Sequence, residues 1–523
     1  MNTNEKTVEK RTSVRNGVGR LVFTGVSIIL QVIWLMTQIT KLNDEYPWIS
    51  LATSLMALIL VLVIYSQHKT SSMKMPWIIL ILVFPVLGVG LYLMIGLSGT
   101  TLKMRQRYAK VDKQLFPRIT QNPEIMEKLE TQDCSQANMA KYIQKYAGYP
   151  VYENTEIEFY GDASEGLAAQ KEAMKKAKKF IFMEYHAIED AESWQGIQEI
   201  LEQKVKEGVE VRLFYDDMGS IWFINTDFVL KMKKLGIQCR VFNPMLPLVN
   251  VFLNNRDHRK ITVIDGEVGF TGGYNLANEY FNLTHPYGHW KDTGIKLTGE
   301  AVKSLTVMFL EMWNAVKGSD KDDTNVNQYF PEISTEKDNF VTGFVQPYGD
   351  SPMDDEQTGE NVYMNIIESA QQYVYFMTPY LIITDEMNHA LGLAAKRGVD
   401  VRIITPGIPD KKLIYKFTRS YYAGLVRNGV RIYEYTPGFC HAKQCVSDDK
   451  VSTCGTINLD YRSLYHHFEN GCVMYGEKAA MDIKNDFEET FAQCREVTEE
   501  YRSGRSAMLR MGLCFLRLFA ELL

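Results

Sequence analysis

The first hundred residues contain three long apolar runs. Residues 21–39 and 48–65 carry no charged side chain, and residues 76–97 form a third run that is interrupted by Pro85, Gly88 and Gly90. A helix needs roughly 20 apolar residues to cross a bilayer, so these runs are long enough to do so. Three successive runs without a small-residue cleavage site do not fit a signal peptide. Residues 1–100 therefore predict an N-terminal membrane anchor.

Basic residues flank this anchor on both sides, with five before the first run and five between positions 103 and 113. Both clusters favour the cytoplasmic side of the membrane, which three complete spans cannot satisfy. Because Pro85 and the two glycines disrupt the third run, we favour two full spans followed by a kinked, re-entrant or interfacial element. Three spans with an external N-terminus are the alternative.

The pattern changes after the anchor. Residues 101–150 are polar and partly helical in period, which indicates a linker or a small helical subdomain. Beyond them, residues 178–186 and 209–217 are typical of buried strands, and the segment between them has a helical pattern. Strands that alternate with helices predict an α/β domain with a largely parallel sheet.

Three of these segments recur later in the same order. Residues 173–185, 204–215 and 233–242 resemble residues 366–380, 394–405 and 426–435. The repeat is far too long for a solenoid and fits two similar domains. We expect them at residues 151–325 and 340–523, the second ending in C-terminal helices, with a charged, turn-rich boundary between them.

Each repeat leads into the same motif, HxK-x4-D-x6-G-x2-N. Its first copy comprises His258, Lys260, Asp265, Gly272 and Asn275, and its second copy comprises His441, Lys443, Asp448, Gly455 and Asn458. Five fixed positions that match twice within a duplicated chain are a strong signal. Asp449 directly follows Asp448, and the spacing favours Asp448 as the motif aspartate.

Residues two apart on a strand face the same side, so each motif presents a histidine and a lysine together. The lysine would repel a metal ion but suits a phosphate, whose oxygens the lysine and the asparagine amide can hold. Gly272 and Gly455 let the backbone approach closely. Asp265 and Asp448 are better suited to bracing the strand and its turn than to meeting the substrate.

Two histidines can divide the work of phosphoryl-group transfer. One would attack phosphorus to form a phosphohistidine, while the other would act first as general acid and then as general base. The residues alone leave open which histidine takes which part. Carboxylates are needed to orient the rings, and Asp292 and Glu469, each downstream of one motif, are suitably placed.

The composition argues against some classes of binding partner. The net charge of −6 gives no basic signature, so a nucleic-acid partner is not expected. The eight cysteines are scattered, which fits neither a disulfide framework nor a zinc ribbon but suits a reducing compartment. His285, His289, His466 and His467 match no zinc-site spacing, so no metal is expected either.

The motifs resemble those of the phospholipase D superfamily. The apolar N-terminus together with "HRKITVIDGEVGFTGGYN", "HWKDTG", "GFCHAK" and "GTINLDYRSLYHHFENG" is similar to its bacterial cardiolipin synthase branch over nearly the whole chain. One departure stands after the motif glycine, where many members have serine and this chain has Gly273 and Thr456.

The resemblance implies two phospholipase D-like domains, each a mixed β-sheet flanked by helices, related by pseudo-twofold symmetry. It also implies transfer of a phosphatidyl group from one phosphatidylglycerol to another through a phosphohistidine, with release of glycerol and without a cofactor or metal. His258 would be the nucleophile and His441 the acid and base. The enzyme would be embedded among the lipids of the bacterial plasma membrane, with its catalytic domains on the cytoplasmic side.

Hydrolysis of phospholipid to phosphatidic acid by a membrane-bound phospholipase D is the alternative. It would use the same residues and differ only in whether water or a lipid alcohol reaches the phosphohistidine. A nuclease or an inactive membrane scaffold is disfavoured by the acidic charge, the anchor and two complete motifs.

Overall fold

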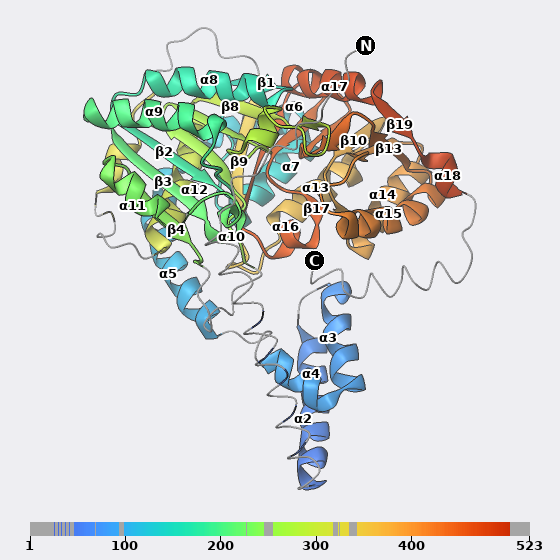
Figure 1. Ribbon diagram of the computed structural model, residues 1–523. Coiled ribbons are helices and arrows are strands. Elements are labelled where there is room, and N and C mark those ends of the chain that lie inside the picture. Colours follow the sequence, from blue (N-terminus) through green and yellow to red (C-terminus); the bar gives the residue numbers. More distant parts are fainter. Residues whose placement is uncertain are drawn as a thin grey trace, which may run out of the picture.

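The computed structural model describes residues 47–67, 70–93, 99–225, 227–244, 255–316, 323, 325–333 and 343–502, with isolated positions at 26, 30, 33, 37 and 41. Two α/β halves lie side by side, and a small group of N-terminal helices projects from one edge of the body they form (Figure 1). The apolar run 21–39 lies outside the described residues except at four isolated positions.

The N-terminal group consists of α2 (Pro47–Ser66), α3 (Ser71–Val83) and α4 (Pro85–Leu91). The interruption expected at Pro85 is present, because the chain leaves the helix at Phe84 (φ −130°) and restarts with Pro85 in the first turn of α4. Gly88 lets α4 approach closely, since a Cβ there would lie 2.5 Å from the Cα of Ile81. Within the described residues, no helix combines the length and the apolar character that crossing a membrane requires.

Helices connect this group to the body. They are α5 (Gly99–Leu115), a 3-10 turn (Phe116–Arg118), α6 (Pro123–Gln132), α7 (Cys134–Tyr142) and a π-helical turn (Ile143–Ala147). The side chain of Asn122 caps the first turn of α6, and that of Asp133 caps α7. α5 packs against α12 (Val302–Ala315), so this part of the chain belongs to the body.

The first half contains a seven-stranded sheet in the order β1-β8-β6-β5-β2-β3-β4. Its strands are β1 (Thr155–Tyr160), β2 (Phe180–Tyr185), β3 (Glu210–Asp216), β4 (Gln238–Phe242), β5 (Lys260–Ile264), β6 (Val268–Gly272) and β8 (Gly294–Gly299). Its helices are α8 (Ala163–Lys175), α9 (Glu192–Lys206), α10 (Asp217–Ser220) and α11 (Phe228–Lys234), with 3-10 turns at Asn278–Phe281 and Val326–Tyr329.

The second half repeats this order as β9-β18-β16-β15-β10-β12-β13, with β19 added beyond β13. Its strands are β9 (Phe344–Asp350), β10 (Tyr373–Met377), β12 (Asp400–Pro406), β13 (Arg431–Tyr435), β15 (Gln444–Ser447), β16 (Val451–Gly455), β18 (Glu469–Tyr475) and β19 (Cys494–Glu496). Its helices are α13 (Thr358–Ser369), α14 (Asp385–Lys396), α15 (Lys412–Arg427), α16 (Tyr461–Tyr465), α17 (Glu477–Phe491) and α18 (Thr498–Arg502).

The matching strand orders confirm the duplication, but the expectation of a largely parallel sheet is wrong. Within the two large sheets, only β2-β3-β4 and β10-β12-β13 run parallel, and the remaining pairings are antiparallel. The reason is local, because β5 and β6 are joined by a three-residue hairpin turn in which Asp265 and Gly266 both adopt positive φ (54° and 73°). β5 and β6 therefore pair directly, without a crossover helix.

The motif aspartates fasten these hairpins to the neighbouring strand. The Asp265 carboxylate accepts hydrogen bonds from the backbone N–H groups of Lys178, Lys179 and Phe180 at 2.7–2.9 Å. Asp448 makes the same three bonds with Gln371, Gln372 and Tyr373 at 2.7–2.9 Å. Asp448, not Asp449, is thus the counterpart of Asp265.

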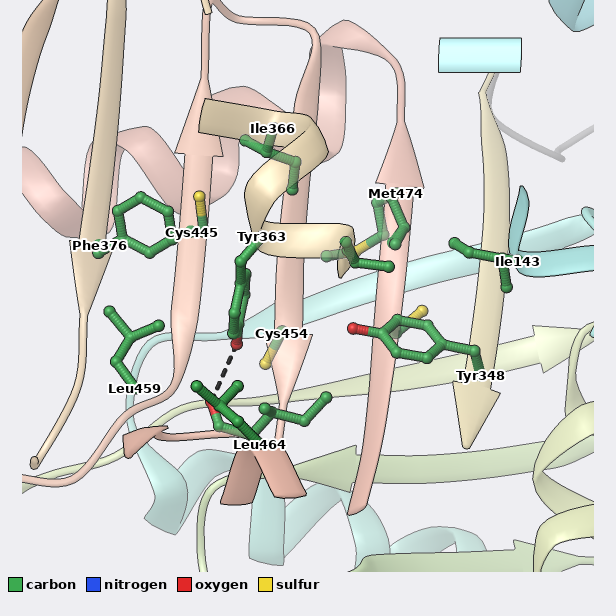
Figure 2. Packing of buried hydrophobic residues seen from close by; sticks show 14 of the residues in the cluster. Ile143, Tyr348, Tyr363, Ile366, Phe376, Cys445, Cys454, Leu459, Leu464 and Met474 are labelled. Atoms are coloured by element: carbon green, nitrogen blue, oxygen red, sulfur yellow. Dashed lines mark hydrogen bonds between the residues drawn. The ribbon is translucent and has the colours of Figure 1, made fainter. Parts of the chain in front are cut away.

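The hydrophobic core is continuous between the two halves of the chain. α12 packs on β5 of its own half and on β9 of the other, and α17 packs on β15 of its own half and on β1 of the other. In the second half, α13 lies across the sheet with Tyr363 inserted among Cys445, Cys454 and Leu459 (Figure 2). The Tyr363 hydroxyl donates to the carbonyl of Ile457 at 2.9 Å and so fixes the loop that carries Asn458.

We predict that Asp265→Ala and Asp448→Ala each lower the free energy of unfolding by about 1–3 kcal/mol, because each leaves backbone N–H groups without their acceptor. Urea titration in detergent would measure the loss. Asp449→Ala is the matched control and should cost less than about 1 kcal/mol, since the Asp449 carboxylate, which pairs with Lys484 and accepts from the Tyr373 hydroxyl, is exposed at the surface. Equal losses for Asp448 and Asp449 would contradict the assignment.

Candidate active site

Each motif histidine belongs to one half of the chain and forms a backbone hydrogen bond with the other half. Strand β7 (His289–Lys291) of the first half pairs in parallel with β14 (Gly438–Cys440) of the second, and the N–H of His441 donates to the carbonyl of Lys291 at 2.7 Å. In the other direction, the N–H of His258 donates to the carbonyl of Phe468 at 2.9 Å. The residues that follow these two acceptors are Asp292 and Glu469.

The histidine side chains also contact the opposite half of the chain. His258 Nδ1 lies 2.9 Å from the Glu469 carboxylate, and His441 Nδ1 lies 2.7 Å from Asp292. All four side chains are buried. An ionised carboxylate can only accept, so in these pairings Nδ1 is the donor and each Nε2 keeps a free lone pair. Lys443 Nζ also lies 2.8 Å from His441 Nδ1. Each imidazole is therefore oriented by a carboxylate from the opposite half.

Two buried lysines supply positive charge to both histidines. Lys260 Nζ donates to the carbonyl of His258 at 2.7 Å, and Lys443 Nζ donates to the carbonyl of His441. Burial lowers the pKa of Lys260 to about 8 and that of Lys443 to about 7. Burial, and then both lysines, hold the pKa of each histidine well below its usual value. Because each lysine acts on both rings, the two motifs form one site.

The two histidines have different neighbours. The ring of His258 lies 5.0 Å from that of His186 and 5.5 Å from that of His467. The ring of His441 instead lies among aromatic side chains, at 5.2 Å from Tyr280, 5.3 Å from Trp290 and 5.8 Å from Phe439. The doubled site is therefore chemically asymmetric.

The motif glycines and asparagines have mainly internal contacts. A Cβ on Gly272 would lie 2.5 Å from the carbonyl of Thr293, and one on Gly455 would lie 2.5 Å from that of Asn470, so both glycines allow neighbouring strands to approach. Asn275 accepts from the N–H of Ala187 at 3.1 Å and donates to the Tyr280 hydroxyl at 2.8 Å. Its predicted phosphate contact, like that of Asn458, stays a prediction.

The contacts at the position after each motif glycine explain why this chain has Gly273 and Thr456 where many family members have serine. A Cβ on Gly273 would lie 2.1 Å from Asp292 Oδ1, so only glycine leaves room for this carboxylate. At the equivalent position, the Thr456 hydroxyl donates to Glu469. The first half thus needs the absence of a side chain here to accommodate its carboxylate, whereas the second half binds its carboxylate with a hydroxyl.

Sequence reasoning missed three residues of the site. Arg259, fully buried just before β5, donates to the carbonyl of Glu469 at 3.1 Å and pairs with Glu311 at 3.0 Å. Nothing in the sequence indicated that Arg259 contacts the other half of the chain. His186 and His467 lie far from His258 in sequence, so only the fold could reveal them.

Among the described residues, one group could converge on a metal ion, formed by His258, His467 and Glu469 with ligand atoms within 4.8 Å of one another. The positive charges of Lys260 and Lys443 act on His258, so a metal cation bound to His258 is disfavoured. All seven cysteines in the described part of the chain are free, and Cys440, Cys445, Cys454 and Cys472 are buried.

Comparison with known proteins identifies relatives along most of the chain. A family model described as cardiolipin synthase, PLD-like domain, matches residues 171–313 and 363–491, and one described as phospholipase D-nuclease N-terminal matches residues 54–96. A cardiolipin synthase of Halalkalibacterium halodurans is 32% identical over 88% of this chain and 91% of its own length. Cardiolipin synthase 1 of Bacillus cereus is 31% identical over 96% of this chain and 98% of its own.

An uncharacterized protein of Streptococcus mutans is 44% identical over 83% of this chain and 92% of its own length. Among solved structures, phosphatidylserine synthase of Haemophilus influenzae has a TM-score of 0.54 at 15% identity and covers 73% of this chain and 99% of its own. At that identity, the likeness supports the fold of the two mixed-sheet halves.

We predict that Gly273→Ser lowers turnover of a phosphodiester substrate by about 10²-fold, because the new side chain displaces Asp292 and misaligns His441. Thr456→Ser is the matched control, since it keeps the hydroxyl that donates to Glu469. Initial rates of the two purified variants provide the measurement. Normal turnover by Gly273→Ser would contradict the steric argument.

Proposed function

This chain belongs to the cardiolipin synthase family with phospholipase D-like domains, and we propose that it transfers a phosphatidyl group between two phosphatidylglycerol molecules to give cardiolipin and glycerol. The observation that carries the proposal is the crossed pairing of two buried histidines with two buried carboxylates, His258 with Glu469 and His441 with Asp292. The lysines between them make the site attractive to one phosphodiester.

In the first step, Nε2 of neutral His258 attacks phosphorus and displaces the glycerol oxygen, which takes its proton from His441. Lys260 and Lys443 stabilise the negative charge that gathers on the phosphoryl oxygens. Because the phosphodiester is anionic, its binding raises the pKa of His441 and favours the protonated form that this step needs. The products of the step are a phosphatidyl-histidine and free glycerol.

In the second step, His441 is neutral and takes a proton from the terminal hydroxyl of a second phosphatidylglycerol. The hydroxyl oxygen attacks phosphorus, the bond to His258 breaks, and cardiolipin leaves with His441 protonated again. The same ring thus acts as acid and then as base. Asp292 and Glu469 keep the Nδ1 protons in place and the rings aimed during both steps.

The asymmetry of the site supports His258 as the nucleophile. Nucleophilic attack needs the neutral ring, and a charge on His441 adds to burial and the two lysines in lowering the pKa of His258. An acid needs the charged ring, and the aromatic side chains around His441 can stabilise an imidazolium through their π-faces. This division agrees with the one that the family resemblance implies.

The N-terminal segment provides the membrane attachment in this proposal. α2 leaves large apolar side chains exposed, among them Leu51 (66%) and Ile59 (63%), which suits a lipid environment better than water. We assign the attachment to the first two apolar runs and place the broken pair α3–α4 as the kinked element. The basic residues after position 100 then put the catalytic halves on the cytoplasmic side of the plasma membrane.

Incubation of the purified full chain with phosphatidylglycerol vesicles tests the reaction itself. We expect cardiolipin and glycerol in equal amounts, measured by mass spectrometry and a glycerol assay. Phosphatidic acid in place of cardiolipin would establish hydrolysis instead. The absence of both products would contradict an enzymatic role.

The roles of the two histidines are tested by trapping the intermediate. His258→Asn and His441→Asn should each lower cardiolipin formation by about 10³-fold or more. With phosphatidylglycerol labelled in its diacylglycerol part, only His441→Asn should retain label on the protein in an acid-labile bond, because it keeps the nucleophile. Label on His258→Asn instead would reverse the assignment.

The pH dependence follows from the lowered pKa values. Because the pKa of His258 lies below its usual 6.5, the nucleophile stays neutral and kcat/KM should hold as pH falls to that value. As pH rises through about 7 to 8, Lys443 and then Lys260 lose their charge, so kcat/KM should decline. Activity that rises steadily from pH 7 to 9 would contradict this assignment of the lysines.

A further inference from the structure

Four large apolar side chains are exposed on segments that contact the active site. They are Trp222 (46% exposed), Leu283 (42%), Ile408 (41%) and Leu413 (53%). A single exposed apolar side chain is common on soluble proteins, but several of them around one site mark an interaction surface. Their positions therefore indicate a partner that covers the surroundings of the two motif histidines.

Ile408 and Leu413 border the site on the side of His441. Ile408 lies in the loop 407–411 that joins β12 to α15, and Leu413 lies in the first turn of α15. The N–H of Ile408 donates to the carbonyl of Gly438 at 3.1 Å, and Gly438 begins the strand β14 that leads directly into His441. This loop is therefore attached to the backbone of the second motif.

Leu283 borders the same side of the site from the first half. It follows Asn282, whose side chain donates to the carbonyl of Trp290 at 3.0 Å and accepts from its N–H at 2.7 Å. The ring of Trp290 lies 5.3 Å from that of His441. The segment that exposes Leu283 is thus held against the aromatic side chains around the second motif histidine.

Trp222 borders the site on the side of His258. It follows α10, in which Gly219 lies so close to His186 that a Cβ there would be 2.7 Å from the imidazole ring. The ring of His186 lies 5.0 Å from that of His258. The exposed apolar side chains are therefore found beside both motif histidines and on both halves of the chain.

Exposed lysines accompany these side chains. Lys411, Lys412 and Lys416 are exposed at the start of α15. Residues 407–416 contain one acidic residue, Asp410. The charge of Lys411 also contributes to the lowered pKa of both motif histidines, which places this lysine near them. Lysines next to large apolar side chains suit the headgroup region of an anionic bilayer, where the charges meet lipid phosphates and the apolar groups enter the acyl boundary.

This surface lies on the side of the body that carries the membrane attachment. α10 follows the carboxyl end of β3 and the loop 407–411 follows that of β12, so both lie at the same end of their sheets. Figure 1 shows α10, α15 and α16 along the edge of the body from which the N-terminal helices project. Met73 of α3 packs into the core of the body, which fixes the N-terminal helices to it. A bilayer that holds the apolar N-terminus is therefore next to this surface.

We propose that these residues form a second membrane contact, an inference that rests on the proposed function. Its members, which we call the docking surface, are Trp222, Leu283, Ile408, Leu413, Lys411, Lys412 and Lys416. The docking surface lies in the headgroup region of an anionic bilayer and brings the histidines to the level of the lipid phosphates. Phosphatidylglycerol then reaches the histidines with its acyl chains still in the bilayer and is not extracted into water.

Two forms of the substrate separate this role from others. Long-chain phosphatidylglycerol is supplied in liposomes that contain the full chain, and dihexanoyl phosphatidylglycerol is supplied as dissolved monomers to the full chain in phosphatidylcholine nanodiscs. In liposomes, Ile408→Asp combined with Leu413→Asp should lower cardiolipin formation by about 10- to 100-fold, because two charges replace side chains that enter the bilayer. With the dissolved substrate, the rate should stay near that of the wild type.

The lysines are tested through the salt dependence of the liposome reaction. Lys412→Gln and Lys416→Gln should each lower cardiolipin formation in liposomes by about 5-fold at low salt, the contribution of one lysine near an anionic surface. The loss should shrink at high salt, because ions screen the attraction between the lysines and the lipid phosphates. A loss that does not depend on salt would contradict the electrostatic part of the contact.

Leu393→Asp is the matched control for the apolar side chains. Leu393 is an equally exposed leucine (46%) near the end of α14, which leads to the start of β12 and so to the opposite end of the sheet from the loop 407–411. Both of its rates should stay normal, and a comparable loss in liposomes would overturn the proposal.

The double variant Ile408→Asp with Leu413→Asp also has outcomes that contradict the docking surface. Unchanged cardiolipin formation in liposomes would overturn it. Equal losses with both substrates would overturn it as well, and a changed oligomeric state in that variant would assign the surface to a second copy of the chain. If the wild-type chain converted neither form of phosphatidylglycerol, the proposed function would fail instead.

Discussion

The structure depends on one exchange between its halves, in which the imidazole of each motif histidine is held by a carboxylate of the opposite half. Glu469 reaches His258 and Asp292 reaches His441, while the backbone beside each carboxylate accepts the N–H of the same histidine. Neither half therefore contains a complete site. The packing of α12 and α17 across both sheets, and of Arg259 on the backbone of Glu469, keeps these crossed contacts in register.

The crossed pairing also places two carboxylates next to the buried basic groups of the site. Burial disfavours the protonated form of both histidines and of both lysines, and the two carboxylates are the nearest compensation. Burial raises the pKa of Asp292 to about 6, so this carboxylate is still ionised at neutral pH. An incoming phosphodiester adds the negative charge that the four basic groups lack. The buried basic groups therefore favour the binding of an anion. The same groups can stabilise the negative charge that develops during the transfer.

The sequence allowed the duplication, the motif residues and the orienting carboxylates to be predicted, because these depend on local spacing and on the chemistry of single residues. It could not show that the carboxylates exchange partners between halves, since crossing is a property of how two domains meet. The sequence overestimates the parallel part of the sheet, because the motif spacing does not show that the turn at Asp265 and Gly266 joins two antiparallel strands. His186, His467 and Arg259 were missed because their roles require contacts between distant segments.

The most direct test of the central claim is an experimental structure of the full chain with vanadate, which mimics phosphorus during the transfer. The account predicts a single vanadate bonded to Nε2 of one motif histidine and contacted by Nε2 of the other, with His258 Nδ1 on Glu469 and His441 Nδ1 on Asp292. Two separate vanadates, one in each half, or histidines paired with carboxylates of their own half, would contradict it.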